Sequence, residues 1–413
     1  MSNTQKKNVP ELRFPGFEGE WEEKKLGDLT DRVIRKNKNL ESKKPLTISG
    51  QLGLIDQTEY FSKSVSSKNL ENYTLIKNGE FAYNKSYSNG YPLGAIKRLT
   101  RYDSGVLSSL YICFSIKSEM SKDFMEAYFD STHWYREVSG IAVEGARNHG
   151  LLNVFVNDFF TILIKYPSLE EQQKIGKFFS KLDRQIELEE QKLELLQQQK
   201  KCYMQKIFSQ ELRFKDENGE DYPDWKEKKL GDITEQSMYG IGASATRFDS
   251  KNIYIRITDI DEKSRKLNYQ NLTTPDELNN KYKLKRNDIL FARTGASTGK
   301  SYIHKEEKDI YNYYFAGFLI KFEIDEQNNP LFIYQFTLTS KFNKWVKVMS
   351  VRSGQPGINS EEYAKLPLVL PNKLEQKKIA EFLDRFDQQI ELEKQKIEIL
   401  QQQKKGLLQS MFI

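Results

Sequence analysis

A glycine-rich segment ending in lysine is the first feature whose residues could do chemistry. It reads Gly-Ala-Ser-Thr-Gly-Lys at 295–300. A phosphate-binding P-loop places four residues between its two glycines, so that backbone N–H groups surround the phosphates. Only three residues separate Gly295 from Gly299, and Thr294 stands where the first glycine belongs. The spacing therefore argues against an ATP site, and a nucleotide-driven enzyme remains only a minor alternative.

The same segment fits a different chemistry, the recognition of nucleic acid. An apolar run followed by a loop of small polar residues and cations occurs at 81–94 and again at 289–300, and a second polar loop follows each at 145–150 and 351–357. Lys, Arg, Ser, Thr, Asn and Gln in such loops can reach phosphates or base edges. The simpler interpretation of any one loop is a solvated turn. The predicted DNA-contacting residues are Lys85, Ser86, Tyr87, Ser88, Asn89, Arg147, Asn148, Arg293, Thr294, Ser297, Thr298, Lys300, Arg352 and Gln355.

Other catalytic or metal-binding patterns are missing from the sequence. The chain has two cysteines and three histidines without paired spacing, which argues against zinc. There is no H-E-x-x-H or G-x-S-x-G motif and no Asn-Pro-Pro-aromatic or Asp-Pro-Pro-aromatic tetrad. No apolar stretch approaches the length of a membrane span, so we expect no membrane association. The few cysteines and the absence of an apolar leader favour a cytoplasmic protein.

The 413 residues form a tandem repeat. KKLGD occurs at 24–28 and 228–232, and LQQQKK occurs at 196–201 and 400–405, so both pairs have the same offset. Residues 171–208 align on 375–412 without gaps, with 22 identities in 38 positions. The mixed blocks between these ends differ. Block 21–170 carries 20 basic and 18 acidic residues, and block 225–374 carries 24 and 18, so the positive charge excess lies in the blocks. Because the ends of the two repeats match and the blocks between them differ, we expect each block to do something different.

Two long helices form the constant frame. Ser168 and Asn372 can cap them, and Glu171 and Glu375 stand three residues later, as in a capping box. Apolar residues then recur at the alternating 4-3 spacing of a coiled coil. We expect the two helices to pair with each other, antiparallel, which would bring the C-terminus back near residue 11; the alternative is that each packs on its own block. The predicted seam residues are Leu182, Ile186, Leu193, Leu196, Phe386, Ile390, Ile397 and Leu400.

The predicted fold class is α+β, with two globular mixed α/β domains joined by two long antiparallel coiled-coil helices in a pseudo-two-fold repeat. The expected limits are 1–20 for the lead-in, 21–166 and 225–370 for the mixed domains, 167–208 and 371–413 for the helices, and 209–224 for the linker.

This organisation resembles the DNA-specificity (S) subunit of Type I restriction–modification enzymes. The resemblance covers nearly the whole chain and depends on the order block–helix–block–helix. It depends also on three sequence motifs: Trp-x4-Leu-Gly-Asp at 21–28 and 225–232, Asp-Ile-Leu-Phe-Ala-Arg-Thr-Gly-Ala-Ser-Thr-Gly at 288–299, and Pro-x3-Glu-Gln-x-Lys-Ile at 167–175 and 371–379. Block 1 departs from the usual Gly-Asp-Ile-Leu phrase with Gly-Glu-Phe-Ala at 79–82.

The resemblance implies a chain without chemistry or a bound cofactor of its own. Each block would be a target-recognition domain that reads one half of a bipartite site on double-stranded DNA, and the helices would set the gap. Two modification (M) subunits would dock on the helices, with the seam residues as the docking residues, and use S-adenosylmethionine for N6-adenine methylation. Restriction (R) subunits would add ATP- and Mg²⁺-dependent translocation and cleavage. A helical scaffold that does not bind DNA is the alternative from another class.

Overall fold

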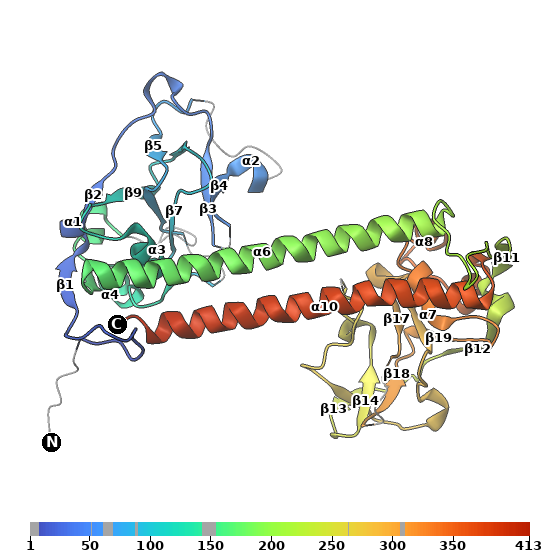
Figure 1. The fold of residues 1–413 in the computed structure, drawn as a ribbon. Helices are drawn as coiled ribbons and strands as arrows, with labels where there is room; N and C mark the ends of the chain where they lie inside the picture. Colours follow the sequence, from blue (N-terminus) through green and yellow to red (C-terminus); the bar gives the residue numbers. More distant parts are fainter. Residues whose placement is uncertain are drawn as a thin grey trace. The chain divides into compact units, whose positions relative to one another are not determined.

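The protein is described from a computed structural model, which covers residues 8–50, 52–60, 69–86, 90–142, 154–262, 264–305 and 310–413. The chain divides into two compact units (Figure 1). Unit 1 is Met1–Gln191 with Lys394–Ile413, and unit 2 is Lys192–Glu393. Both long helices are divided between the units. The limits predicted for the mixed blocks, 21–166 and 225–370, stay a prediction.

The long helices are α6 (Leu169–Phe208) and α10 (Lys373–Ser410), close to the ranges predicted. They are antiparallel in each unit, as predicted. In unit 1 Lys396 forms an ion pair with Glu189, and Lys404 forms one with Asp183. Unit 2 repeats both pairs at the equivalent repeat positions, as Lys192–Glu393 and Lys200–Asp387. These pairs give the polar seam positions partners within the chain.

The eight apolar seam residues are buried or half-buried. In unit 2 the seam continues through Tyr203, whose ring contacts Phe382 and Phe386 at centroid distances of 5.2 and 5.6 Å. A seam of this kind is the coiled-coil pattern expected from the spacing.

One feature of the helix starts differs from expectation. The N–H groups of Glu171 and Glu375 donate to the side chains of Ser168 and Asn372, so both caps form. The two carboxylates do not complete a capping box. Each lies buried and accepts two hydrogen bonds from one guanidinium in the segment before its block, Arg13 for Glu171 and Arg213 for Glu375. A buried carboxylate gains more from a charged bidentate partner than from one backbone N–H, because both of its oxygens then have charged donors.

The mixed block of unit 1 is built from short strands and helices. A four-stranded sheet has the order β2-β9-β6-β7, and β1-β10, β3-β4 and β5-β8 form two-stranded sheets. The elements are β1 (Glu22–Lys25), α1 (Leu26–Leu29), β2 (Thr30–Arg32), η1 (Lys38–Leu40), β3 (Leu46–Ser49), β4 (Gly53–Asp56), α2 (Gln57–Tyr60), β5 (Thr74–Lys77), β6 (Phe81–Asn84), β7 (Ala95–Arg98), β8 (Ser104–Leu107), β9 (Tyr111–Ile116), α3 (Lys122–Asp130), α4 (Tyr135–Ile141), α5 (Val156–Phe159) and β10 (Leu163–Tyr166).

Unit 2 repeats this plan with a sheet of order β12-β19-β16-β17 and the pairs β11-β20, β13-β15 and β14-β18. The lead-in strand pairs antiparallel with the strand before the long helix in both units. The elements are β11 (Lys226–Lys229), η2 (Leu230–Ile233), β12 (Thr234–Tyr239), β13 (Ala245–Arg247), β14 (Asn252–Ile255), η3 (Ile257–Asp259), β15 (Thr273–Pro275), η4 (Asn280–Tyr282), β16 (Ile289–Ala292), η5 (Gly295–Ser297), β17 (Ser301–Ile303), β18 (Asn312–Phe315), β19 (Leu319–Ile324), α7 (Pro330–Phe336), α8 (Ser340–Met349), α9 (Ser360–Ala364) and β20 (Pro367–Leu370).

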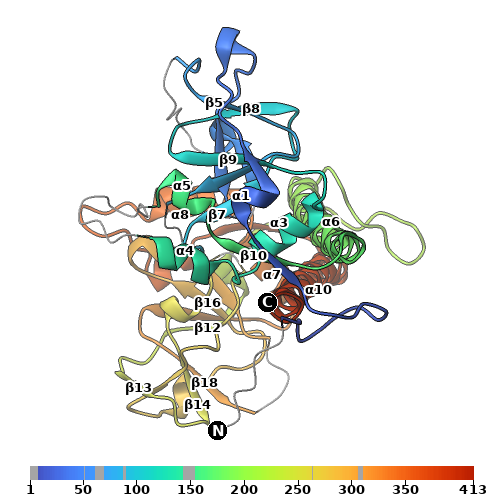
Figure 2. The same cartoon turned by 90° about the vertical axis from the view of Figure 1, so that its left-hand side faces the viewer.

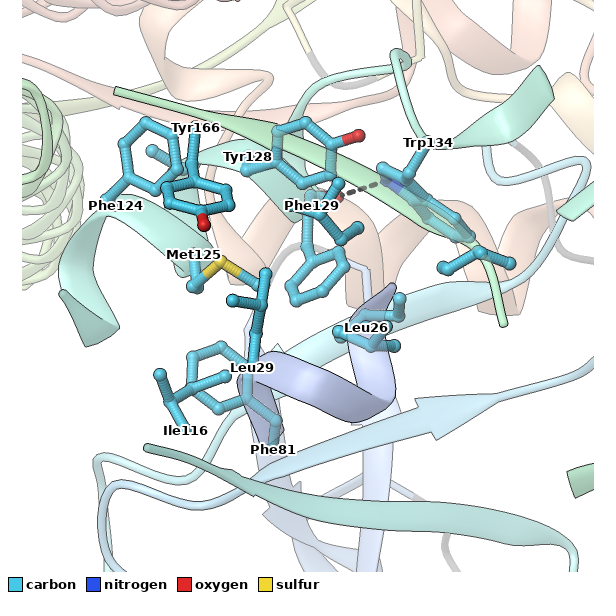
Figure 3. Close-up of a cluster of buried hydrophobic side chains, with 14 of the residues drawn as sticks. Leu26, Leu29, Phe81, Ile116, Phe124, Met125, Tyr128, Phe129, Trp134 and Tyr166 are labelled. Atoms are coloured by element: carbon cyan, nitrogen blue, oxygen red, sulfur yellow. Dashed lines mark hydrogen bonds between the residues drawn. The ribbon is translucent and has the colours of Figure 1, made fainter. Parts of the chain in front are cut away.

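The main core of unit 1 is rich in aromatic side chains and lies between the four-stranded sheet, α3 and the long helices (Figure 3). Trp134 donates from its indole Nε1 to the carbonyl oxygen of Phe129, which satisfies the polar atom of a buried ring. The C-terminus lies near α3 (Figure 2). The residues that follow α10 complete this core, since Phe412 is buried against Phe124 and Trp21. Unit 2 has an equivalent core that takes in Met204 and Ile207 at the end of α6. The core of each block therefore includes side chains from the C-terminal end of one long helix.

The fold is α+β, as predicted. No helix in the described part of the chain is long and apolar enough to cross a membrane.

Candidate nucleic-acid interface

The two cation-bearing loops occupy the same place in both sheets. Residues 85–94 connect β6 to β7, and residues 293–300 connect β16 to β17. The turns that enter these hairpins also correspond, because Gly79 and Asn287 both have positive φ, 83° and 72°. The unusual Gly-Glu-Phe-Ala phrase of block 1 therefore forms the same turn and strand as its counterpart in block 2.

A glycine near the end of each loop is required by its surroundings. Gly94 and Gly299 have φ values of 80° and 86°, in the left-handed region that favours glycine. A Cβ on Gly94 would lie 2.1 Å from the carbonyl oxygen of Asn84, and a Cβ on Gly299 would lie 2.5 Å from the Val346 side chain. The chain is thus closely packed where each loop returns to the sheet, at Gly94 and at Gly299.

In unit 2 the two predicted loops lie next to each other. Gly295 donates from its backbone N–H to the carbonyl oxygen of Pro356 at 2.9 Å, and Ile358 donates to that of Arg293 at 2.9 Å. Thr294 and Gly357 also form an isolated antiparallel bridge. Two loops that are distant in the sequence thereby form one surface.

Arg293 is the cation of this surface that is best placed to meet a ligand. It follows β16 directly, and its Cζ lies 4.9 Å from the centre of the Tyr239 ring, at the end of β12. Tyr239 is itself fixed, because its hydroxyl accepts a hydrogen bond from the backbone N–H of Ser360. Among the described residues the Arg293 side chain has no hydrogen-bond or acidic partner, and its buried Nε is unpaired.

The other two predicted cations of unit 2 are engaged within the fold. Arg352 donates to both oxygens of Glu362, at 2.6 and 2.5 Å, and to the carbonyl oxygens of Met349 and Val351. Lys300 is only 9% exposed, and its ammonium donates to the carbonyl oxygen of Ile260. The simplest role of Lys300 here is to tie the hairpin to the neighbouring segment, which leaves its predicted DNA contact without structural support.

The polar residues of the surface differ in exposure. Thr298 donates to the carbonyl oxygen of Gly295 and thus stabilises the turn. Thr294 and Ser297 are half-buried, whereas Gln355 is exposed. Phe318 is 60% exposed directly before β19, and its carbonyl oxygen accepts from the N–H of Arg293. Tyr239 and Phe318 were not predicted from the sequence, because nothing local marks residues far from the loop as its neighbours.

The corresponding surface in unit 1 is described only in part. Lys85 is half-buried, and its ammonium donates to the carbonyl oxygen of Val154 at 3.3 Å. Ser86 is half-buried beside it. Leu110 is exposed directly before β9, as Phe318 is before β19. The remaining predicted residues of block 1 lie outside the described part of the chain: Tyr87, Ser88, Asn89, Arg147 and Asn148.

No group of three or more His, Cys, Asp or Glu side chains within the described ranges is arranged to hold a metal ion. The surface offers hydrogen-bond donors, a stacked guanidinium and exposed rings. That chemistry is suited to binding phosphates and base edges.

Comparison with known proteins identifies the architecture. The family model of the Type I restriction modification DNA specificity domain matches twice, at residues 18–198 and 222–402, once in each copy of the repeat. The chain belongs to this family. It is thus a specificity subunit of the Type I restriction–modification class, whose role is recognition of DNA sequence.

One relative matches nearly the whole chain and another matches about half of it. The Type I restriction enzyme MjaVIII specificity subunit of Methanocaldococcus jannaschii is 26% identical over 427 residues, covering 97% of this chain and 93% of its own. The HindI specificity subunit of Haemophilus influenzae is 28% identical over 201 residues, covering 46% of this chain and 41% of its own.

Solved structures share the fold at low identity. The Type I restriction–modification S subunit from M. genitalium has a TM-score of 0.61 at 16% identity, over 98% of this chain and 99% of its own. A chain from a structure concerning complex assembly and conformational transition of the Type I system has a TM-score of 0.54 at 15% identity, over 98% and 99%.

Proposed function

We propose that this specificity subunit reads a bipartite, asymmetric site on double-stranded DNA, with one recognition block for each half. The observation that carries the proposal is the repetition of one sheet plan with different loops. Both units have the four-stranded order and the hairpin that presents the loop, but the loop of block 2 carries Arg293 where block 1 has Lys85. Two blocks with the same sheet order but different loop sequences are suited to binding two different half-sites.

The long helices would set the gap between the half-sites. A helix of about 40 residues spans about 60 Å, and half-sites read from one face of the duplex are separated by about 34 to 36 Å. Ion pairs at fixed positions along the two helices, such as Lys192–Glu393, oppose sliding of one helix along the other. A helix pair with a fixed register is suited to setting a distance.

The chain would direct other subunits and catalyse nothing itself. Two modification subunits using S-adenosylmethionine would methylate adenine at N6, and restriction subunits would add ATP- and Mg²⁺-dependent cleavage. The methylome of a methylation-free host tests this proposal directly. A bipartite adenine motif should appear only when this chain and its modification subunit are present, and exchange of block 29–166 should change one half alone. If an active modification subunit produces no chain-dependent motif, the proposal is wrong.

The outer faces of the helices are the proposed docking surface for the modification subunits. The predicted seam residues are used within the chain, because they face the partner helix or the blocks. Two residues after a seam position the side chain points about 200° around the helix, away from the seam. At those positions Leu188 and Ile399 are exposed in unit 1, and Leu195 and Leu392 are exposed in unit 2. Each unit therefore exposes one apolar side chain on the outer face of each helix, at equivalent repeat positions, which suits two copies of one partner.

This docking surface can be tested by stoichiometry. The double variant L188D/I399D should reduce the number of modification subunits bound from two to one in native mass spectrometry. Leu374 is a matched control, because it is an exposed leucine of α10 away from these four positions, and L374D should bind both copies. Retention of both copies by L188D/I399D would place docking elsewhere.

A further inference from the structure

We propose that Arg293, held on the ring of Tyr239, reads a guanine base edge in the half-site recognised by block 2. This inference rests on the proposed function and adds the identity of one base and the side chains that select it.

The position of the pair supports the inference. Arg293 follows β16 and Tyr239 ends β12, and both strands flank β19 in the same sheet. The turn before β19 brings the exposed Phe318 to the same edge, through the hydrogen bond from the Arg293 N–H. The edge therefore joins a cation and two aromatic rings that come from three separate segments.

The charge balance singles out Arg293. Arg352 is neutralised by Glu362, and the ammonium of Lys300 is buried against a backbone carbonyl. Within the described residues Arg293 has a cation–π contact and no counter-ion. A guanidinium without an acidic partner costs little at a surface that meets an acceptor-rich ligand, and DNA supplies such acceptors.

The geometry suits a base edge. The Cζ of Arg293 lies over the Tyr239 ring, 4.9 Å from its centre, which restricts the guanidinium, and the Nε is buried and unpaired, so the terminal nitrogens are the free donors. Two donors in a fixed plane match the O6 and N7 acceptors of guanine in the major groove. A guanidinium can hold a phosphate through the same two donors, and the tests below separate the two ligands.

The test uses the full-length chain co-expressed with its modification subunit in a methylation-free host, read out by methylome sequencing. The half-site assigned to block 2 by block exchange should contain a guanine. R293K keeps the charge but loses the planar pair of donors, so preference for that guanine over other bases should fall roughly 5- to 150-fold. The half-site of block 1 should keep its sequence. R385K, an exposed arginine of α10, is the control and should give the wild-type motif.

Two Tyr239 variants separate the ring from its hydroxyl. Y239A removes the platform and should relax the same base position, whereas Y239F keeps the ring face and should retain more of the preference than Y239A. Equal relaxation in the two variants would overturn the platform role.

A binding measurement covers variants that fail to methylate. The purified complex competes for duplexes in which that guanine is replaced by 7-deazaguanine, which lacks the N7 acceptor. The wild type should lose affinity for the modified duplex, and R293A should bind both duplexes equally. A half-site without guanine, or an R293A that weakens all sequences alike and lowers the salt dependence, would overturn the inference in favour of a phosphate contact. Failure of the proposed function differs from both, because the wild type itself would then give no motif.

Discussion

The backbone nitrogen of Leu12 donates a 2.8 Å hydrogen bond to the carbonyl oxygen of Ser410. Unit 2 contains the same bond as Leu212 to Lys206, at 3.0 Å, between residues that are close together in the sequence. The end of α10 thus takes, in unit 1, the place that the end of α6 takes in unit 2 through a short local connection. The predicted return of the C-terminus to residue 11 is confirmed by this contact.

The core contact of the last helix should make unit 1 sensitive to a change at the C-terminus. Phe412 is 1% exposed and packs on Trp21, Phe124 and Phe179. F412A should lower the free energy of unfolding of unit 1 by about 3 to 5 kcal/mol, because it leaves a cavity among rings. Hydrogen exchange should show the loss in block 1 and spare block 2. I399A, at an exposed site of the same helix, should have little effect, and equal destabilisation by both would contradict the packing.

The buried charge cluster of unit 1 should be sensitive to loss of its central cation. Lys404 contacts Asp130 at 2.8 Å and Asp183 at 2.6 Å, and Lys97 contacts Asp130 at 2.6 Å. K404M leaves Asp183 without this partner and should cost about 3 to 5 kcal/mol, as expected for a broken buried pair. Urea unfolding measures the change, and K405M at the exposed neighbouring position is the control. A K404M variant as stable as K405M would show that the cluster contributes no net stability.

The same cluster predicts a loss of stability in acid. Burial of Asp130 opposes its charge, but Lys97 and Lys404 outweigh this effect and lower its pKa to about 2. The unfolded pKa is about 3.9. A lowered carboxyl pKa stabilises the folded state above the unfolded value, and this stabilisation is lost as the pH falls from about 4 toward 2.

D130N should therefore be less stable than the wild type at pH 6, and the difference should shrink below about pH 4. Urea unfolding from pH 6 to pH 3 checks this. D103N, at an exposed aspartate of the same unit, should show no such convergence. A constant difference between D130N and the wild type over the whole range would contradict the assigned role.

The seam pair Lys192–Glu393 should show energetic coupling. Glu393 is buried, and its carboxylate lies 2.5 Å from the Lys192 ammonium. A double-mutant cycle with K192L and E393L should give a coupling energy of about 1 to 3 kcal/mol, because the carboxylate is shielded from water. The exposed pair Lys377–Glu381, at 3.9 Å, provides the comparison and should couple by about 0.3 to 0.5 kcal/mol. Equal coupling in the two cycles would mean that burial does not strengthen the seam pair.

The proposed spacing function predicts the effect of helix length. Insertion of one heptad after Gln191 in α6 and one after Glu393 in α10 keeps the seam pattern and adds about 10 Å to each helix. At about 3.4 Å per base pair the gap in the methylated motif should grow by about three base pairs. Both half-sites should keep their sequences, and an unchanged gap would show that the helices do not set it.

Much of the frame could be predicted from the sequence, because its signals are local or periodic. The 4-3 spacing indicated the seam, and Ser168 and Asn372 indicated the helix starts. The constant repeat interval indicated two similar units, and the ion pairs of α6 and α10 recur at that interval. Glu171 was assigned to a capping box and instead binds Arg13, because a distant guanidinium competes with the local backbone.

The candidate interface depended on tertiary structure. The sequence marked Arg293 and Lys300 as equal cations of one loop, and only the fold separates them. The hairpin turns Lys300 toward the carbonyl oxygen of Ile260, whereas Arg293 stacks on Tyr239, which belongs to a strand much earlier in the chain. Burial and aromatic stacking depend on which strands meet in the sheet. Periodicity along the chain does not encode such non-local pairings, so the sequence determined the repeated frame and the tertiary structure decided which side chains face a ligand.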